Sequence, residues 1–142
     1  MAEPGIYLLD TNAVSHIMRN TAGAVAQRYR EHLLSTEPPR MVTSVVVQCE
    51  LAFGLAKTPS PRLQAAYDIQ MQQLPVLPLD EDVVGYYASL RAALELAGTP
   101  MGANDLLIAA HALAVGATVV TNDTDFLRVP GLAVENWLLA PS

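Results

Sequence analysis

Residues 6–18 read IYLLDTNAVSHIM, a short apolar run that stops at an acid and continues into an amphipathic segment. The run itself has no polar alternation, which is typical of a strand buried on both faces of a sheet. Asp10 therefore lies at the carboxyl end of the predicted strand. Thr11 and Asn12 are expected to cap a helix that begins near Ala13, since their side-chain oxygens can accept free N–H groups of a first turn. The segment predicts a strand followed by a helix, as in α/β proteins.

The same alternation of short apolar runs and helical patterns continues along the chain. Further strands are predicted at residues 41–44, 75–79, 117–121 and 132–134. Further helices are predicted from Thr21 to the prolines at 38 and 39, from 45 to 56 after the cap Ser44, from Pro61 to about 71 after the cap Ser60, between Asp80 and Gly98, and from 104 to 115. We therefore expect one α/β domain, residues 1–142, with a mainly parallel central sheet of four to five short strands and helices on both faces.

The overall composition excludes several classes of protein. Hydrophobic residues make up 51% of the 142 residues, which excludes a disordered chain. The formal net charge of −6 argues against a general nucleic-acid coat, which depends on Lys and Arg. The single Cys49 is expected to be a small buried hydrophobic residue in a reducing compartment. With no secretory signal and no membrane-spanning run in the sequence, a cytoplasmic protein is expected.

Four acids from separate parts of the sequence are expected to meet at one edge of the sheet. Asp10 and Asp123 follow the carboxyl ends of two predicted strands, where open parallel sheets bind their ligands. Asp105 lies in the first turn of a predicted helix. Glu50 lies on an otherwise apolar helical stripe and needs an explanation. Each acid alone has a simpler interpretation as a helix cap, an exposed residue or a turn residue, and only their joint pattern favours a site.

Grouped carboxylates with few basic partners repel one another, so they must take up protons or a cation. Hard oxygen ligands favour Mg²⁺ or Mn²⁺, and no Cys/His spacing in the sequence resembles a zinc site. Such a site can activate a water molecule and stabilise the leaving oxygen in phosphodiester hydrolysis. The acids therefore point to a metal-dependent hydrolase.

Five sequence blocks together resemble PIN-domain proteins, and among these the VapC-type toxins of bacterial toxin–antitoxin pairs. The blocks occur in the family's order: LLDTN at 8–12, VVQCELAFGL at 46–55, ANDLLIAAHAL at 103–113, TNDTDF at 121–126 and VPGLAVENW at 129–137. They span nearly the whole chain. The resemblance implies a PIN-like fold and an Mg²⁺- or Mn²⁺-dependent endoribonuclease. It also implies a homodimer, held inactive by a cognate VapB-type antitoxin whose C-terminal segment covers the site.

Carried over residue by residue, the resemblance assigns roles within the predicted site. The metal-binding and catalytic set it implies is Asp10, Glu50, Asp105 and Asp123. Asn12 and Thr121 match polar positions that line and orient the pocket. Asp125 is a second acid in the last acidic block, and the sequence leaves open how it shares the role of Asp123.

The eight basic residues are scattered along the sequence, so any RNA-binding rim has to be assembled by folding. Arg19 and Lys57, each just after a predicted helix that carries site residues, are the expected phosphate contacts. His111 is expected to be a surface or interface residue and not a catalytic one. Neither Ser15 nor Ser44 has the sequence context of a Ser-His-Asp triad.

Three other functions remain open at the level of the sequence. A PIN-fold module could bind RNA or protein without catalysis, although all four acids are present. A stand-alone RNA-processing nuclease would carry the same site without an antitoxin. An Asp-based phosphatase or receiver-like protein fits less well, since such a phosphatase would place a second acid where this chain has Asn12.

Overall fold

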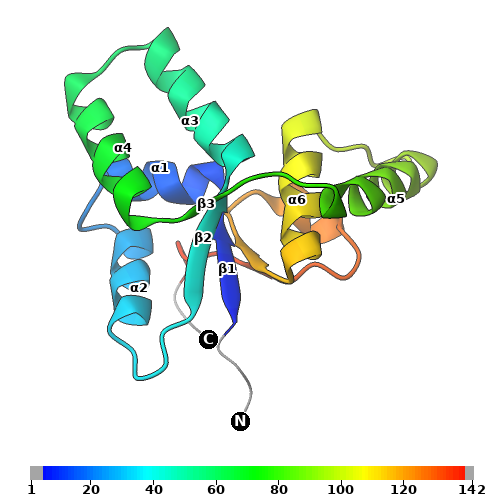
Figure 1. Ribbon diagram of the computed structural model, residues 1–142, viewed down its shortest axis with the longest axis horizontal. Coiled ribbons are helices and arrows are strands. Elements are labelled where there is room, and N and C mark those ends of the chain that lie inside the picture. The colour runs from blue at the N-terminus through cyan, green and yellow to red at the C-terminus, as the bar shows by residue number, and fades with distance from the viewer. Residues whose placement is uncertain (1–4, 140–142) are drawn as a thin grey trace.

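The computed structural model describes residues 5–139 as a parallel sheet enclosed by helices (Figure 1). The sheet has five strands in the order β3-β2-β1-β4-β5, and every pair of neighbours is parallel. The strands are β1 (Ile6–Leu9), β2 (Arg40–Ser44), β3 (Val76–Leu77), β4 (Thr118–Val120) and β5 (Val134–Glu135). The predicted fold class is confirmed.

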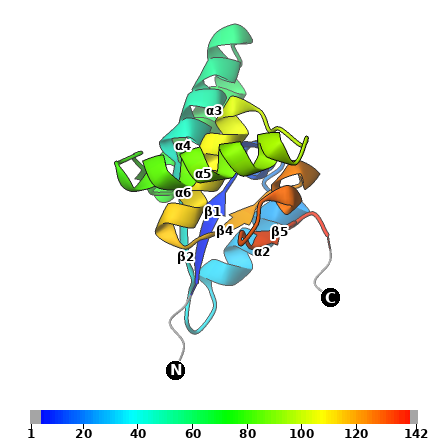
Figure 2. The same ribbon diagram turned by 90° about the vertical axis from the view of Figure 1, so that its right-hand side faces the viewer.

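Helices cover both faces of the sheet. They are α1 (Thr11–Arg19), α2 (Ala24–Leu33), α3 (Val45–Lys57), α4 (Pro61–Gln73), α5 (Asp82–Leu96), α6 (Ala103–Val115) and the short 3₁₀ helix η1 (Thr124–Arg128). Figure 1 shows α1 and α2 on one side of the sheet and α6 on the other, with α5 outside α6. Figure 2 shows α5 and α6 in front of the strands. Among the described residues, no helix is long and apolar enough to cross a membrane.

The core lies on both faces of the two central strands. Leu8 and Leu9 of β1 are fully buried, as is Val119 of the neighbouring β4. Burying a Leu or Val side chain contributes about 1.5–3 kcal/mol. The apolar run that predicts the first strand is thus the centre of the hydrophobic core.

The order of the strands reverses between β1 and β4. From β1 the chain moves outward through β2 and β3, then returns to place β4 and β5 on the other side. Leu9 pairs with Val120, and the backbone N–H of Asp10 donates to the Val120 carbonyl over 3.0 Å. Open α/β sheets bind their ligands at such a reversal, beyond the carboxyl ends of the strands. Asp10 lies there.

The start of α3 is tied to α6 by a buried polar pair. The Ser44 hydroxyl accepts from the Val46 N–H over 3.1 Å, so the predicted cap is confirmed. The same oxygen lies 2.8 Å from Nδ1 of His111. His111 is only 2% exposed, so its expected surface position is wrong. Its ring has a partner inside the protein, which allows a polar side chain to be buried.

The expected burial of Cys49 is also wrong, because its side chain is exposed. Helices α3 and α4 project beyond the edge of the sheet, so the outer surface of α3 is not packed on the core (Figure 1). Phe53, one helical turn further on, is 67% exposed on the same helix. The apolar sequence around Glu50 therefore does not place every residue of α3 in the core.

Several element boundaries differ from those predicted. Helix α1 begins at Thr11, and neither Thr11 nor Asn12 is its cap because both side chains bond to site residues instead. Helix α2 begins at Ala24 and ends before the prolines at 38 and 39. Strand β3 is shorter than predicted because the flanking prolines at 75 and 78 have no N–H for a ladder.

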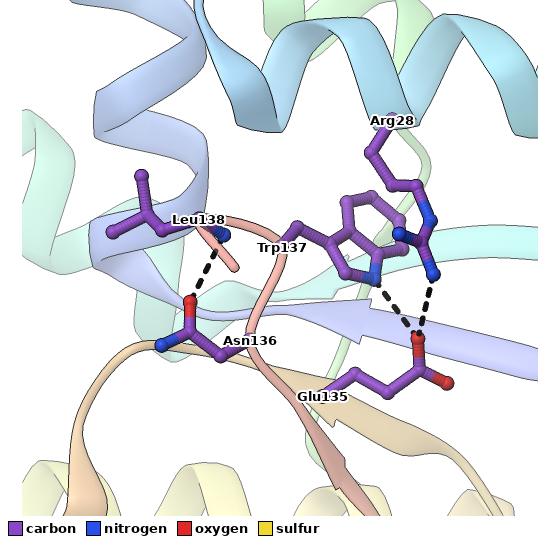
Figure 3. Close-up of polar contacts among 5 residues, drawn as sticks. All are labelled: Arg28, Glu135, Asn136, Trp137 and Leu138. Carbon is purple, nitrogen blue, oxygen red and sulfur yellow. Dashed lines mark hydrogen bonds and ion pairs between the residues drawn. The ribbon is translucent and has the colours of Figure 1, made fainter. Parts of the chain in front are cut away.

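The segment after β5 is fixed against α2 by an aromatic and ionic cluster (Figure 3). Trp137 is 3% exposed and donates its indole N–H to Glu135 over 3.1 Å. Arg28 of α2 lies 4.0 Å from the same Glu135 oxygen. Tyr7 of β1 meets the Trp137 ring edge-on at 5.4 Å between ring centroids. The end of the described chain is thereby anchored to the sheet and to α2.

Candidate metal centre

Three carboxylates converge beyond the carboxyl ends of β1 and β4. Asp105 lies in the first turn of α6, Asp123 is the N-cap of η1 and Asp125 lies in its first turn. One oxygen from each lies within 4.8 Å of the others. The structure therefore groups Asp125 with Asp105 and Asp123, a point that the sequence left open.

Asp10 is the most deeply buried acid of the site, with 3% of its surface exposed. Its Oδ2 accepts hydrogen bonds from Thr121 over 2.8 Å and from Asn12 over 3.2 Å. Its Oδ1 is also buried but has no partner among the described residues. A buried oxygen without a partner is costly for the fold unless something else binds it.

Asn12 and Thr121 hold the loop after β4 in place. The Asn12 amide donates to Thr121 Oγ1 over 2.8 Å, and its carbonyl accepts from the Asn122 N–H over 3.0 Å. Thr121 Oγ1 also accepts from the Asp123 N–H over 3.0 Å. The two polar residues thus join the first turn of α1 to the loop that carries Asp123, and they orient Asp10 as well.

Glu50 approaches the group from α3. The Thr11 hydroxyl donates to Glu50 Oε1 over 2.6 Å, which fixes this carboxylate at the start of α1. Glu50 is not one of the three most closely grouped acids. Burial is the main cause that raises the pKa of Asp10 and Asp105, and the negative charge of Glu50 adds to it. Asp105 thus feels the negative charge of the other four acids.

The electrostatics show how crowded the carboxylates are. Burial, followed by repulsion from Asp10 and Asp123, raises the pKa of Asp105 to about 6. Burial is also the main reason that the pKa of Asp10 is raised. Among the ion pairs of residues 5–139, the one that involves these acids joins Arg128 to Asp125 over 3.0 Å. One Arg at the rim of five acids leaves most of their charge uncompensated.

These residues fit a divalent cation that prefers oxygen ligands. The donor set is made of carboxylates, which are the groups that Mg²⁺ and Mn²⁺ prefer in proteins. The unpartnered Oδ1 of Asp10 supplies an oxygen that no described protein group satisfies. The raised pKa of Asp105 reflects burial and repulsion that disfavour its ionised form, and a bound cation would offset both.

The other residues predicted for the site lie elsewhere. Arg19 and Lys57 are exposed at the last residues of α1 and α3. Lys57 is seven residues beyond Glu50, about 10 Å along the helix. The role of Thr11 is missed by the sequence patterns, as is that of Arg128. The only sequence signal for the role of Thr11 is its position directly after Asp10, the acid at the end of a strand.

Comparisons with known proteins agree with this geometry. The PIN domain family matches residues 7–132 of the chain. Ribonuclease VapC2 of Rickettsia felis is 35% identical over 93% of this chain and 98% of its own length. A tRNA(fMet)-specific endonuclease VapC of Salmonella typhimurium is 34% identical over 92% of this chain and 97% of its own.

A solved structure has the same fold. The crystal structure of VapBC2 from Rickettsia felis, bound to a DNA fragment from its promoter, contains a chain that superposes with a TM-score of 0.83. The identity is 33%, and the match covers 93% of this chain and 98% of that one. The sequence similarity and the structural similarity to the Rickettsia felis protein both cover 93% of this chain.

Proposed function

The chain belongs to the PIN domain family, and we propose that it is a ribonuclease that hydrolyses RNA phosphodiester bonds as the toxin of a toxin–antitoxin pair. The observation that carries the chemistry is the convergence of Asp105, Asp123 and Asp125 within 4.8 Å, beside a buried Asp10. The names of its relatives support the choice of RNA as substrate.

Asp10, Glu50, Asp105 and Asp123 would hold Mg²⁺ or Mn²⁺, together with Asp125, which lies close to Asp105 and Asp123. A divalent cation bound there would lower the pKa of an attacking water molecule and offset the charge on the leaving oxygen. The protein's own part is to hold the carboxylates in place. Asn12 and Thr121 orient Asp10 and the loop of Asp123, and Thr11 orients Glu50. A carboxylate of the set would accept the proton of the attacking water.

Arg19 and Lys57 are proposed to contact phosphates of the RNA outside the acidic centre. Both are exposed, and neither has an acidic partner among the ion pairs of residues 5–139. A strand held at such positions would be kept in register with the metal, since phosphate contacts fix position without reading sequence.

A VapB-type antitoxin and a second copy of the chain are the proposed protein partners. The similar chain of known structure comes from a VapBC2 complex, which supports the first. The same likeness favours a toxin over a stand-alone processing nuclease. A noncatalytic module is disfavoured because the acids are all present and grouped.

The proposed function is tested by RNA cleavage with purified protein. The wild-type chain is expected to cleave bulk tRNA with Mg²⁺ or Mn²⁺ and to be inactive in excess chelator. Asp105→Asn is expected to lower the cleavage rate by about 100-fold or more, because it removes a ligand of the proposed metal. The matched control is Asp68→Asn on α4, an exposed acid bonded to Gln64, which should cleave like the wild type. Equal rates for both variants would reject the assignment.

A further inference from the structure

Three arginine side chains gather at the end of α1 farthest from the acids. Arg62 of α4 donates to the carbonyl of Arg19 over 3.2 Å, and Arg30 of α2 donates to the carbonyl of Thr21 over 2.7 Å. Arg19 itself donates to the Ser15 hydroxyl over 3.2 Å. Arg30 of α2 and Arg62 of α4 thus reach the backbone of residues 19–21, and Arg19 is the last residue of α1, with its side chain turned back to Ser15. We call Arg19, Arg30 and Arg62 the guanidinium cluster.

The positive charge of the guanidinium cluster is not neutralised by the part of the chain that the structure describes. The ion pairs there involve Arg28, Arg91 and Arg128, and none involves the cluster. The partners of Arg30 and Arg62 are neutral carbonyls, which position a guanidinium but do not offset its charge. Each guanidinium has five donors and uses few of them here.

An exposed, concentrated positive charge in a protein of net charge −6 fits an anion with several oxygen acceptors. Phosphate groups have this character, and Arg binds them with paired donors. The acidic centre and the guanidinium cluster are therefore of opposite charge and lie at opposite ends of one helix.

A polar stripe on α1 joins the two. Thr11, Ser15 and Arg19 follow one another at spacing four, so they share one face of the helix. Thr11 bonds to Glu50 at the acidic end, and Ser15 bonds to Arg19 at the other. The stripe is about 12 Å long, given 1.5 Å per residue. Helical side chains lean toward the N-terminus, so Arg19 leans toward the acids.

We propose that the guanidinium cluster binds backbone phosphates of the RNA substrate. These phosphates are close along the RNA to the nucleotides that lie at the acidic centre. The substrate strand then runs along the stripe of Thr11, Ser15 and Arg19. This inference rests on the proposed function and extends it. It adds Arg30 and Arg62 to the RNA-binding surface and gives the path of the RNA along α1. RNA is favoured over an acidic peptide because the stripe leads to a centre that fits phosphodiester hydrolysis.

The test is RNA binding in excess chelator, where cleavage does not interfere. A fluorescent single-stranded RNA oligonucleotide is titrated with wild type, with Arg30→Gln/Arg62→Gln and with the matched control Arg40→Gln/Arg91→Gln. Both variants make the net charge more negative by two. The cluster variant is expected to bind about 20-fold more weakly at 0.1 M salt, with a smaller salt dependence, because two phosphate contacts are lost. The control should stay within about twofold, since its loss of charge lies elsewhere.

Two further measurements separate a binding role from a structural one. Arg30→Lys/Arg62→Lys keeps the charge and is expected to recover most of the affinity, whereas equal losses for the Lys and Gln variants would overturn the proposal. Poly-glutamate of matched length is the second probe. The proposal would also be overturned if the cluster variant bound RNA like the wild type but no longer bound poly-glutamate. That result would favour an acidic protein partner.

These outcomes can be told apart from failure of the proposed function. If the wild type binds RNA through the guanidinium cluster but does not cleave it with Mg²⁺ or Mn²⁺, the proposed function fails and the binding surface stands. If Asp105→Asn abolishes cleavage while the cluster variant binds and cleaves like the wild type, the proposed function stands and the inference fails.

Discussion

The hydroxyl of Thr11 donates to Oε1 of Glu50 over 2.6 Å and joins the first turn of α1 to the middle of α3. Glu50 lies on α3, which packs on the core through Val46, Val47 and Leu51 and projects beyond the sheet (Figure 1). The bond from Thr11 fixes the end of the Glu50 side chain. It also begins the polar stripe that ends at the guanidinium cluster.

Thr11→Val tests this relationship, because Val keeps the shape of Thr and removes the hydroxyl. We expect the affinity for Mn²⁺ to fall about 10-fold, as is typical when a residue that orients a ligand is lost. Calorimetry measures the affinity, and Thr11→Ser is the control that restores the donor. Unchanged Mn²⁺ affinity in Thr11→Val would show that the bond does not position Glu50 for a metal.

Ser44→Ala tests the junction of α3 and α6. The variant loses the cap of α3 and leaves the buried His111 without a partner. We expect the free energy of unfolding to fall by about 2 kcal/mol, measured by urea denaturation. Ser60→Ala is the matched control, because Ser60 caps α4 at the surface and leaves no buried group unpaired. Its loss should be smaller, and an equal loss would contradict a role for the pair with His111.

The raised pKa of Asp105 predicts how the stability of the metal-free protein depends on pH. Its usual value is 3.8, and in the fold it is about 6. Between these values the folded chain holds a proton that the unfolded chain has released. The stability from this group is therefore present below about pH 4 and is lost as the pH rises through 6.

Asp105→Asn should consequently be more stable than the wild type at pH 8 in chelator. The gain should be on the order of 1 kcal/mol, once solvent screening of a partly exposed group is allowed for. It should shrink toward zero at about pH 3, where Asp105 is mainly protonated in both states. Thermal unfolding at the two pH values measures it. A gain of the same size at both pH values would contradict the raised pKa.

Much of the fold follows from local sequence patterns. Short apolar runs predict β1, β2 and β4 because each lies in the core, and Ser44 and Ser60 mark the starts of α3 and α4 because their side chains cap them. The first turn of α1 could not be predicted in this way. The polar groups of Thr11 and Asn12 could have served as caps, but tertiary partners use them instead.

The sequence predicts Asp10 and Asp123 at the same edge because the strand ends of a parallel sheet meet there, and the structure places Asp10 after β1 and Asp123 just beyond β4. What the sequence cannot show depends on contacts between distant residues. The burial of His111 depends on Ser44, 67 residues away. The guanidinium cluster likewise needs α1, α2 and α4 to meet, and no local pattern around Arg30 or Arg62 predicts it.

The central claim is that the grouped carboxylates make a metal-dependent ribonuclease centre. Its most direct test is the initial rate of RNA cleavage by chelator-stripped protein as Mn²⁺ is added, for the wild type and Asp10→Asn. We predict no cleavage without metal, a saturable rise for the wild type and no rise for the variant. A full rate for the wild type in excess chelator, or for Asp10→Asn with Mn²⁺, would contradict the claim.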